Sequence, residues 1–90
     1  MTKSAIATLA KGMAVDLASR GITVNTVQPG PTGSDMTPED GPRVDFLKGL
    51  IPVGRLGKDD EIAGLVSYVV SPEAAFITGA TLTIDGGYAA

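Results

Sequence analysis

The sequence contains no cysteine, no histidine and no tryptophan, and aromatic residues make up only 4% of its 90 residues. Without cysteine, the chain can form neither a disulfide nor a thiolate metal site. Without histidine, it lacks the most common general base and the most common metal ligand of proteins, so we expect no metal site. A core with so few aromatic rings has to be built from aliphatic side chains and alanine.

Hydropathy and charge exclude further classes of function. No segment approaches the ~20 apolar residues that a membrane-spanning helix needs, and the first residues lead into an amphipathic segment rather than a signal-peptide core. The net charge is −3, which argues against nucleic acid or a membrane surface as the partner. We therefore expect a cytoplasmic chain whose length allows one small domain.

Residues 2–20 are predicted to form a helix. Its apolar residues recur at helical spacing along one stripe, namely Ile6, Leu9, Ala10, Met13, Ala14 and Leu17. Thr2 or Ser4 can cap its start, and Gly21 suits the left-handed conformation that ends many helices. The small residues of this helix predict close packing against another helix. Since the sequence offers no obvious partner, we expect a second copy or further sequence to cover the stripe.

A β-branched run, Ile22–Val27, is predicted to form a buried parallel strand that stops at Pro29 and Gly30. Proline cannot donate to a strand ladder, and glycine is free to take a positive φ, so the chain is expected to turn sharply there. Ligands of open α/β sheets bind beyond the carboxyl ends of the strands. We therefore take Pro29–Met36 as the candidate ligand loop.

The rest of the chain is predicted to contain a lid-like loop, a helix and a strand. The loop covers residues 29–42, and Arg43–Leu50 is expected to form one or two short helical turns. The second helix is predicted over Asp59–Val70, and the second strand over Thr81–Ile84, before a tight turn at 85–87. The buried stripe of the second helix is expected to consist of Ile62, Leu65, Val66, Val69 and Val70. Strand, helix and strand in this order form a βαβ unit with parallel strands.

Three acidic residues, Asp59, Asp60 and Glu61, open the second helix. A metal site is one interpretation of such a cluster. The interpretation we prefer is a solvated helix N-terminus, where negative charge interacts favourably with the helix dipole.

Short motifs run through the whole chain in a fixed order. They are Thr2-Lys3-Ser4-Ala5, Asn25-x-Val27-x-Pro29-Gly30, Ser34-Asp35-Met36, Gly54-Arg55, Glu61-Ile62-Ala63, Ile77-Thr78-Gly79 and Asp85-Gly86-Gly87. With these motifs the chain resembles the C-terminal portion of the short-chain dehydrogenases/reductases, and it is similar to the bacterial branch of the oxoacyl-acyl-carrier-protein reductases. Gln28–Pro31 and Asp40–Pro42 also resemble a branch proposed to bind cyclic dinucleotides.

The resemblance implies an α/β fold, the C-terminal third of a Rossmann-like doubly wound parallel sheet. Residues 1–90 would then form a single incomplete Rossmann-like domain. It also implies hydride transfer between NAD(H) or NADP(H) and a small carbonyl or alcohol substrate. In addition, it implies homo-oligomers, which would form through residues 2–20 and through the last helix and strand.

The resemblance also assigns candidate site residues. Lys3 matches the lysine of the family's Tyr-x-x-x-Lys motif, where the ammonium lowers the pKa of the tyrosine and holds the nicotinamide ribose. The positions that match the family's cofactor-holding segment are Pro29, Gly30, Thr32 and Ser34. Thr32 replaces the usual isoleucine or valine, and Ser34 the usual threonine.

Two functions remain open at this point. The family's catalytic tyrosine and serine and its glycine-rich phosphate loop match no residue of this sequence. We therefore expect a fragment of an NAD(P)-dependent oxidoreductase that is not catalytically competent alone and whose cofactor site is incomplete without a partner. The alternative is a non-catalytic module that self-associates or binds a small ligand at 29–42. In that case Lys3 is an exposed lysine at a helix start, and Pro29-Gly30 is a plain turn.

Overall fold

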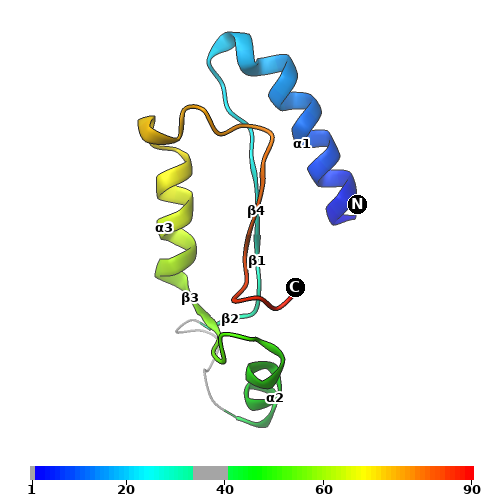
Figure 1. Cartoon of the computed structure of the whole chain (residues 1–90), viewed down its shortest axis with the longest axis vertical. Coiled ribbons are helices and arrows are strands. Elements are labelled where there is room, and N and C mark those ends of the chain that lie inside the picture. The colour runs from blue at the N-terminus through cyan, green and yellow to red at the C-terminus, as the bar shows by residue number, and fades with distance from the viewer. Residues whose placement is uncertain (1, 34–40) are drawn as a thin grey trace. The chain divides into compact units, whose positions relative to one another are not determined.

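The structure is a computed structural model that describes residues 2–33 and 41–90, and it confirms the α/β class (Figure 1). Its elements are α1 (Lys3–Leu17), η1 (Ala18–Arg20), β1 (Thr26–Pro29), β2 (Thr32–Gly33), α2 (Pro42–Leu50), β3 (Gly57–Lys58), α3 (Asp59–Val69), η2 (Pro72–Ala74) and β4 (Thr81–Ile84). The chain divides into two compact units, one of Met1–Val27 with Val66–Leu82 and one of Gln28–Leu65 with Thr83–Ala90.

Local sequence signals set both ends of the first helix, as predicted. The Thr2 hydroxyl accepts a hydrogen bond from the Ala5 N–H at 3.1 Å and so caps α1. At the other end, Gly21 has a φ of 72°, and its N–H donates to the Ala18 carbonyl. The only change from a regular helix over 2–20 is that its last turn tightens into the 3-10 helix η1.

The apolar stripe of α1 is largely open to solvent. Ala14 is buried and lies close to Gly79, where a Cβ would be 3.5 Å from the Ala14 Cβ. The larger side chains of the stripe, Ile6, Leu9 and Met13, are 43–55% exposed. Within the described part of the chain, the helix therefore presents an uncovered apolar face.

The first strand begins later than its β-branched residues predict. The prediction of a strand over Ile22–Val27 is wrong for its first four residues, because β1 starts at Thr26. One backbone bond, from the Gly79 N–H to the Val24 carbonyl at 2.7 Å, and several side-chain bonds take the place of a strand ladder there. The Val24 N–H donates to the Thr78 hydroxyl, and the Asn25 amide donates to the Ile77 carbonyl and accepts from the Ala80 N–H, both at 3.1 Å.

Beyond Asn25, β1 pairs with β4 in a two-stranded sheet (Figure 1). The Thr26 N–H donates to the Ala80 carbonyl at 2.9 Å, and the Gly30 N–H donates to the Ile84 carbonyl at 3.0 Å. Both partners advance by four residues between these bonds, so the strands are parallel, as the βαβ prediction requires. The strand β4 covers the predicted residues Thr81–Ile84.

The predicted loop over residues 29–42 contains a strand that the sequence did not indicate. Thr32 and Gly33 form β2, which pairs in parallel with β3 in the register Thr32↔Gly57 and Gly33↔Lys58. The helical turns predicted after the loop form the helix α2, which starts at a proline, as many helices do.

The second predicted helix, α3, ends one residue earlier than expected, at Val69. Of its predicted buried stripe, Ile62, Leu65 and Val69 are half-buried. The prediction is wrong for Val66 and Val70, which are 44% and 78% exposed. Within residues 2–33 and 41–90, none of the helices is both long and apolar enough to cross a membrane.

Asn25 should be important for the stability of the first unit. We predict that Asn25→Ala lowers the free energy of unfolding by about 1–3 kcal/mol, because it leaves the Ile77 carbonyl and the Ala80 N–H without partners. Urea denaturation followed by circular dichroism measures this change. As a control, Thr23→Ala at an exposed neighbouring position should change stability by less than about 0.5 kcal/mol. Equal stabilities of the two variants would contradict the prediction.

Candidate functional site

The candidate ligand loop begins at Gly30, directly after β1. A Cβ added to Gly30 would lie 2.5 Å from the Asp85 Cβ and 2.8 Å from the Asp85 Cα. Such distances are too short for a side chain, so only glycine fits. Gly30 does not use its freedom to take a positive φ, because it is not among the positive-φ glycines. The close approach of Asp85 is the reason for glycine here.

Thr32 has polar groups in its side chain and its backbone that could bind a ligand. Its hydroxyl donates to the Gly30 carbonyl at 2.9 Å, which leaves the oxygen lone pairs able to accept. The Gly57 N–H donates to the Pro31 carbonyl at 3.0 Å. Thr32 is paired with Gly57, and in a parallel ladder Gly57 bonds to the residues before and after its partner. The N–H and C=O of Thr32 itself therefore face away from β3. Within residues 2–33 and 41–90 no other strand pairs with β2, so Thr32 offers one backbone donor and one acceptor on the edge that faces away from β3.

The other candidate residues are Pro29, Lys3 and Ser34. Pro29 is exposed at the end of β1. Lys3 is the first residue of α1, exposed, and belongs to the first unit, whereas Gly30 and Thr32 belong to the second. Ser34 lies outside the described residues.

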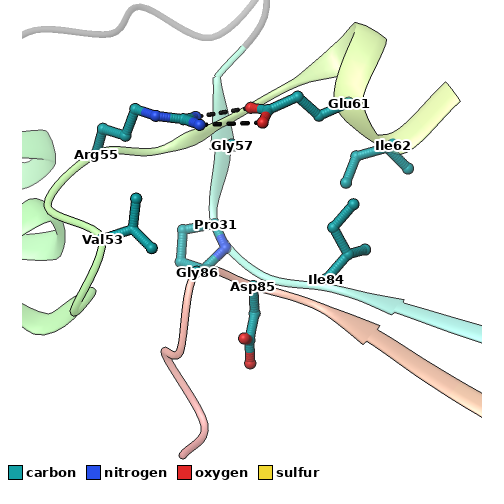
Figure 2. Close-up of a pocket in the computed structure, with 9 residues that line it drawn as sticks. All are labelled: Pro31, Val53, Arg55, Gly57, Glu61, Ile62, Ile84, Asp85 and Gly86. Carbon is teal, nitrogen blue, oxygen red and sulfur yellow. Dashed lines mark hydrogen bonds and ion pairs between the residues drawn. The ribbon is translucent and has the colours of Figure 1, made fainter. Parts of the chain in front are cut away.

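A hollow of about 180 Å³ lies in the second unit beside this segment (Figure 2). Its walls come from the loop after β1, the segment before β3, the start of α3 and the end of β4. The lining residues are Pro31, Val53, Arg55, Gly57, Glu61, Ile62, Ile84, Asp85 and Gly86. It is smaller than the roughly 300–1,000 Å³ of typical small-molecule sites. The hollow alone therefore does not form a complete ligand site.

An ion pair between Arg55 and Glu61 borders the hollow (Figure 2). The Arg55 guanidinium donates to both Glu61 carboxylate oxygens, at 2.7 and 3.0 Å. One of these oxygens also accepts from the Lys58 N–H at 3.0 Å, which is the backbone half of a capping box at the start of α3. Hydrogen bonds from Arg55 and then from Lys58 lower the pKa of Glu61 to about 2.

The sequence prediction missed this pair, although it used both residues as family motifs. Besides its place in a family motif, Glu61 is predicted to be one of three acidic residues that favour a helix N-terminus. The sequence does contain a signal for its role as a cap. Lys58 precedes α3, and Glu61 stands three residues later, which is the position of the acidic partner in a capping box. Among the described residues, no cluster of histidine, cysteine, aspartate or glutamate could hold a metal ion.

Comparison with known proteins identifies relatives along nearly the whole chain. The sequence model described as enoyl-(acyl carrier protein) reductase matches residues 1–89. The cyclic-di-GMP-binding biofilm dispersal mediator protein of Escherichia coli is 47% identical over 89 residues, which cover 99% of this chain and 38% of that protein. The 3-oxoacyl-[acyl-carrier-protein] reductase FabG of Vibrio cholerae is 48% identical over 87 residues, covering 94% and 35%.

Solved structures give the same result. A short-chain dehydrogenase/reductase from Serratia marcescens superposes with a TM-score of 0.91 at 57% identity, over 98% of this chain and 36% of that one. BdcA in complex with NADPH superposes with a TM-score of 0.85 at 48% identity, over 94% and 35%. The chain thus spans little more than a third of the length of the proteins it matches.

The Arg55–Glu61 pair makes the second unit sensitive to acid. Because the pKa of Glu61 is lower in the folded chain than its ordinary value of 4.5, this carboxylate stabilises the fold above that pH. The contribution is lost as the pH falls from 4.5 towards 2. We predict a midpoint near 2 for the Glu61 carboxyl in a carbon-detected NMR titration, and a clearly higher midpoint in Arg55→Gln.

Arg43→Gln is the matched control, since the structure shows no ion pair between Arg43 and Glu61. This variant should leave the Glu61 midpoint unchanged. A Glu61 midpoint that is the same with and without Arg55 would show that the pair does not form.

Proposed function

Because the chain belongs to the short-chain dehydrogenase/reductase family, we propose that it supplies the nicotinamide end of the cofactor site in an NAD(P)-dependent oxidoreductase. In this proposal residues 1–90 correspond to the C-terminal third of the family fold, and the substrate is a small carbonyl or alcohol compound. One observation supports it most: Thr32 presents a backbone donor and a backbone acceptor on the edge of β2 that faces away from β3.

A nicotinamide carboxamide carries one acceptor oxygen and an NH₂ donor. The Thr32 N–H and C=O complement these groups, and binding there would fix which face of the nicotinamide ring meets the substrate. Gly30 assists by its lack of a side chain, since the backbone can pass close to Asp85 and continue directly into β2. The NADPH named in the BdcA structure supports NADP(H) as the cofactor to test first.

The reduced nicotinamide supplies the hydride when it is bound. Lys3 has the second role in the proposal, through its charge. Its exposed ammonium at the start of α1 would hold the ribose hydroxyls and lower the pKa of a neighbouring phenol, so that the phenol can give or take a proton near neutral pH. The proposal thus assigns Thr32 to orientation and Lys3 to proton transfer.

The relatives support a choice of substrate for this proposal. One of them is named a 3-oxoacyl-[acyl-carrier-protein] reductase. For this chain a 3-oxoacyl thioester, which offers a ketone as hydride acceptor, is therefore the first substrate to test. A cytoplasmic location likewise stays a prediction.

A fusion protein tests the catalytic role of Lys3. The part of the Vibrio cholerae reductase that precedes the matched region is joined to residues 1–90, and NADPH oxidation by a 3-oxoacyl thioester is followed spectrophotometrically. We predict that Lys3→Met lowers kcat/KM by about 10²–10⁴-fold, because the proton transfer loses its ammonium partner. The control Lys11→Met changes an exposed lysine of the same helix and should keep the activity. A folded but inactive fusion, or full activity of Lys3→Met, would contradict the proposal.

The uncovered face of α1 favours the second candidate function, self-association. Ile6, Leu9 and Met13 share this face and are 43–55% exposed. Fully burying an exposed side chain of this kind is worth about 1.5–3 kcal/mol, so covering the exposed half of each would contribute about half as much, which favours a partner. The predicted contact regions remain residues 2–20 and the last helix and strand.

Sedimentation of the 90-residue chain tests this candidate. We predict a dimer or larger species at micromolar concentration, and a shift towards monomer in Leu9→Lys. Val15→Lys is the matched control, because Val15 is 79% exposed on the opposite side of the helix, at roughly 100° of rotation per residue. A wild-type chain that sediments as one monomeric species would rule out self-association.

A further inference from the structure

Asp85 follows β4, and three segments of the second unit meet around it: the start of the ligand loop, the chain after α2 and the C-terminal turn. We propose that Asp85 is a positioning residue for Gly30–Thr32. Its carboxylate folds the C-terminal turn of residues 85–90, and this turn holds the candidate cofactor segment in place. The inference rests on the proposed function and adds to it a role for the Asp85 carboxylate.

Both carboxylate oxygens of Asp85 bind the turn that follows it. One accepts from the Gly87 N–H at 2.9 Å and the other accepts from the Ala89 N–H at 3.0 Å. Gly86 and Gly87 have φ values of 64° and 92°, a region in which other residues are strained. Figure 2 shows the carboxylate pointing away from Arg55 and Glu61. The side chain thus serves the turn and takes no part in the ion pair.

On one side, the turn supports the cofactor segment. Gly30 donates its N–H to the Ile84 carbonyl and touches the Asp85 Cα and Cβ so closely that no side chain would fit. The Gly30 carbonyl in turn accepts the Thr32 hydroxyl at 2.9 Å. A shift of Asp85 would therefore move Gly30 directly and Thr32 through Gly30.

On the other side, the same turn supports the chain after α2. The Gly86 carbonyl accepts from the Val53 N–H at 3.1 Å. A Cβ at Gly86 would lie 2.9 Å from Ile51 Cγ2, and a Cβ at Gly87 would lie 2.9 Å from Pro52 Cγ. Ile51 is buried, with 3% exposed. The turn therefore fits between two segments, and a change in its conformation reaches both.

Amide hydrogen exchange on the 90-residue chain tests the positioning without any activity. Asp85→Ala removes both acceptors, whereas Asp85→Asn keeps one oxygen and replaces the other by an NH₂ group that cannot accept. We expect exchange at Gly30 and Val53 to speed up by about tenfold in Asp85→Ala, because part of the stabilisation lost with the two hydrogen bonds to the carboxylate reaches these amides, and by less in Asp85→Asn. The amides of Thr26 and Gly79, bonded within the first unit, should not change. Unchanged exchange at Gly30 and Val53, or an equal change at all four amides in both variants, would overturn the inference.

Kinetics of the fusion protein provide the second measurement. We expect Asp85→Ala to raise the KM for NADPH by about tenfold with kcat changed less than about twofold, and Asp85→Asn to recover part of the loss. The control Asp16→Ala changes an exposed acid on α1 and should leave both constants as they are. A fall in kcat with an unchanged KM would also overturn the inference. An inactive fusion combined with the expected exchange pattern would count against the proposed function alone.

Discussion

The close contact between Gly30 and Asp85 is the constraint on which the second unit depends. It occurs where β1 and β4 end side by side, and the backbone bond from Gly30 to Ile84 closes the sheet at the same point. A side chain at Gly30 would force the strand ends apart, and β2 could then not start two residues later. The polar edge of Thr32 thus depends on a missing side chain in one strand and on the path of the other.

Local signals predicted the helices well. The ends of α1 follow from one threonine and one glycine, and the boundaries of α3 follow from an acidic first turn and a serine–proline stop. These signals act within a few residues of the chain, so a single sequence reveals them. The parallel strand β4 was also predicted at its observed residues.

The errors come from contacts between distant residues and from the conformation of loops. The β-branched run before Thr26 was predicted as strand, but Asn25 and Thr78 replace the ladder with side-chain bonds. The pairing of β2 with β3 and the ion pair of Arg55 with Glu61 depend on loop conformation, which residue type alone does not encode. Glycine at position 30 was expected for its freedom to take a positive φ, but the structure requires it because of the close contact with Asp85, which is visible only in the fold. Among the candidate site residues, Thr32 is the one whose role depends most on the structure, because the direction of its backbone N–H and C=O is visible only in the fold.

The pairing of β1 with β4 also has a consequence for biosynthesis. The backbone bonds that hold the two strands together, from Thr26 to Ala80 and from Gly30 to Ile84, join residues more than 50 positions apart in the sequence. During translation β1 leaves the ribosome long before its partner exists, and closing so long a loop costs chain entropy before any bond repays it. The backbone groups that β4 later pairs remain open on β1 throughout this interval, and open strand edges attract other chains. The helix α1 needs only local contacts and can form early, so the growing chain would carry an ordered helix beside a strand that still awaits its partner.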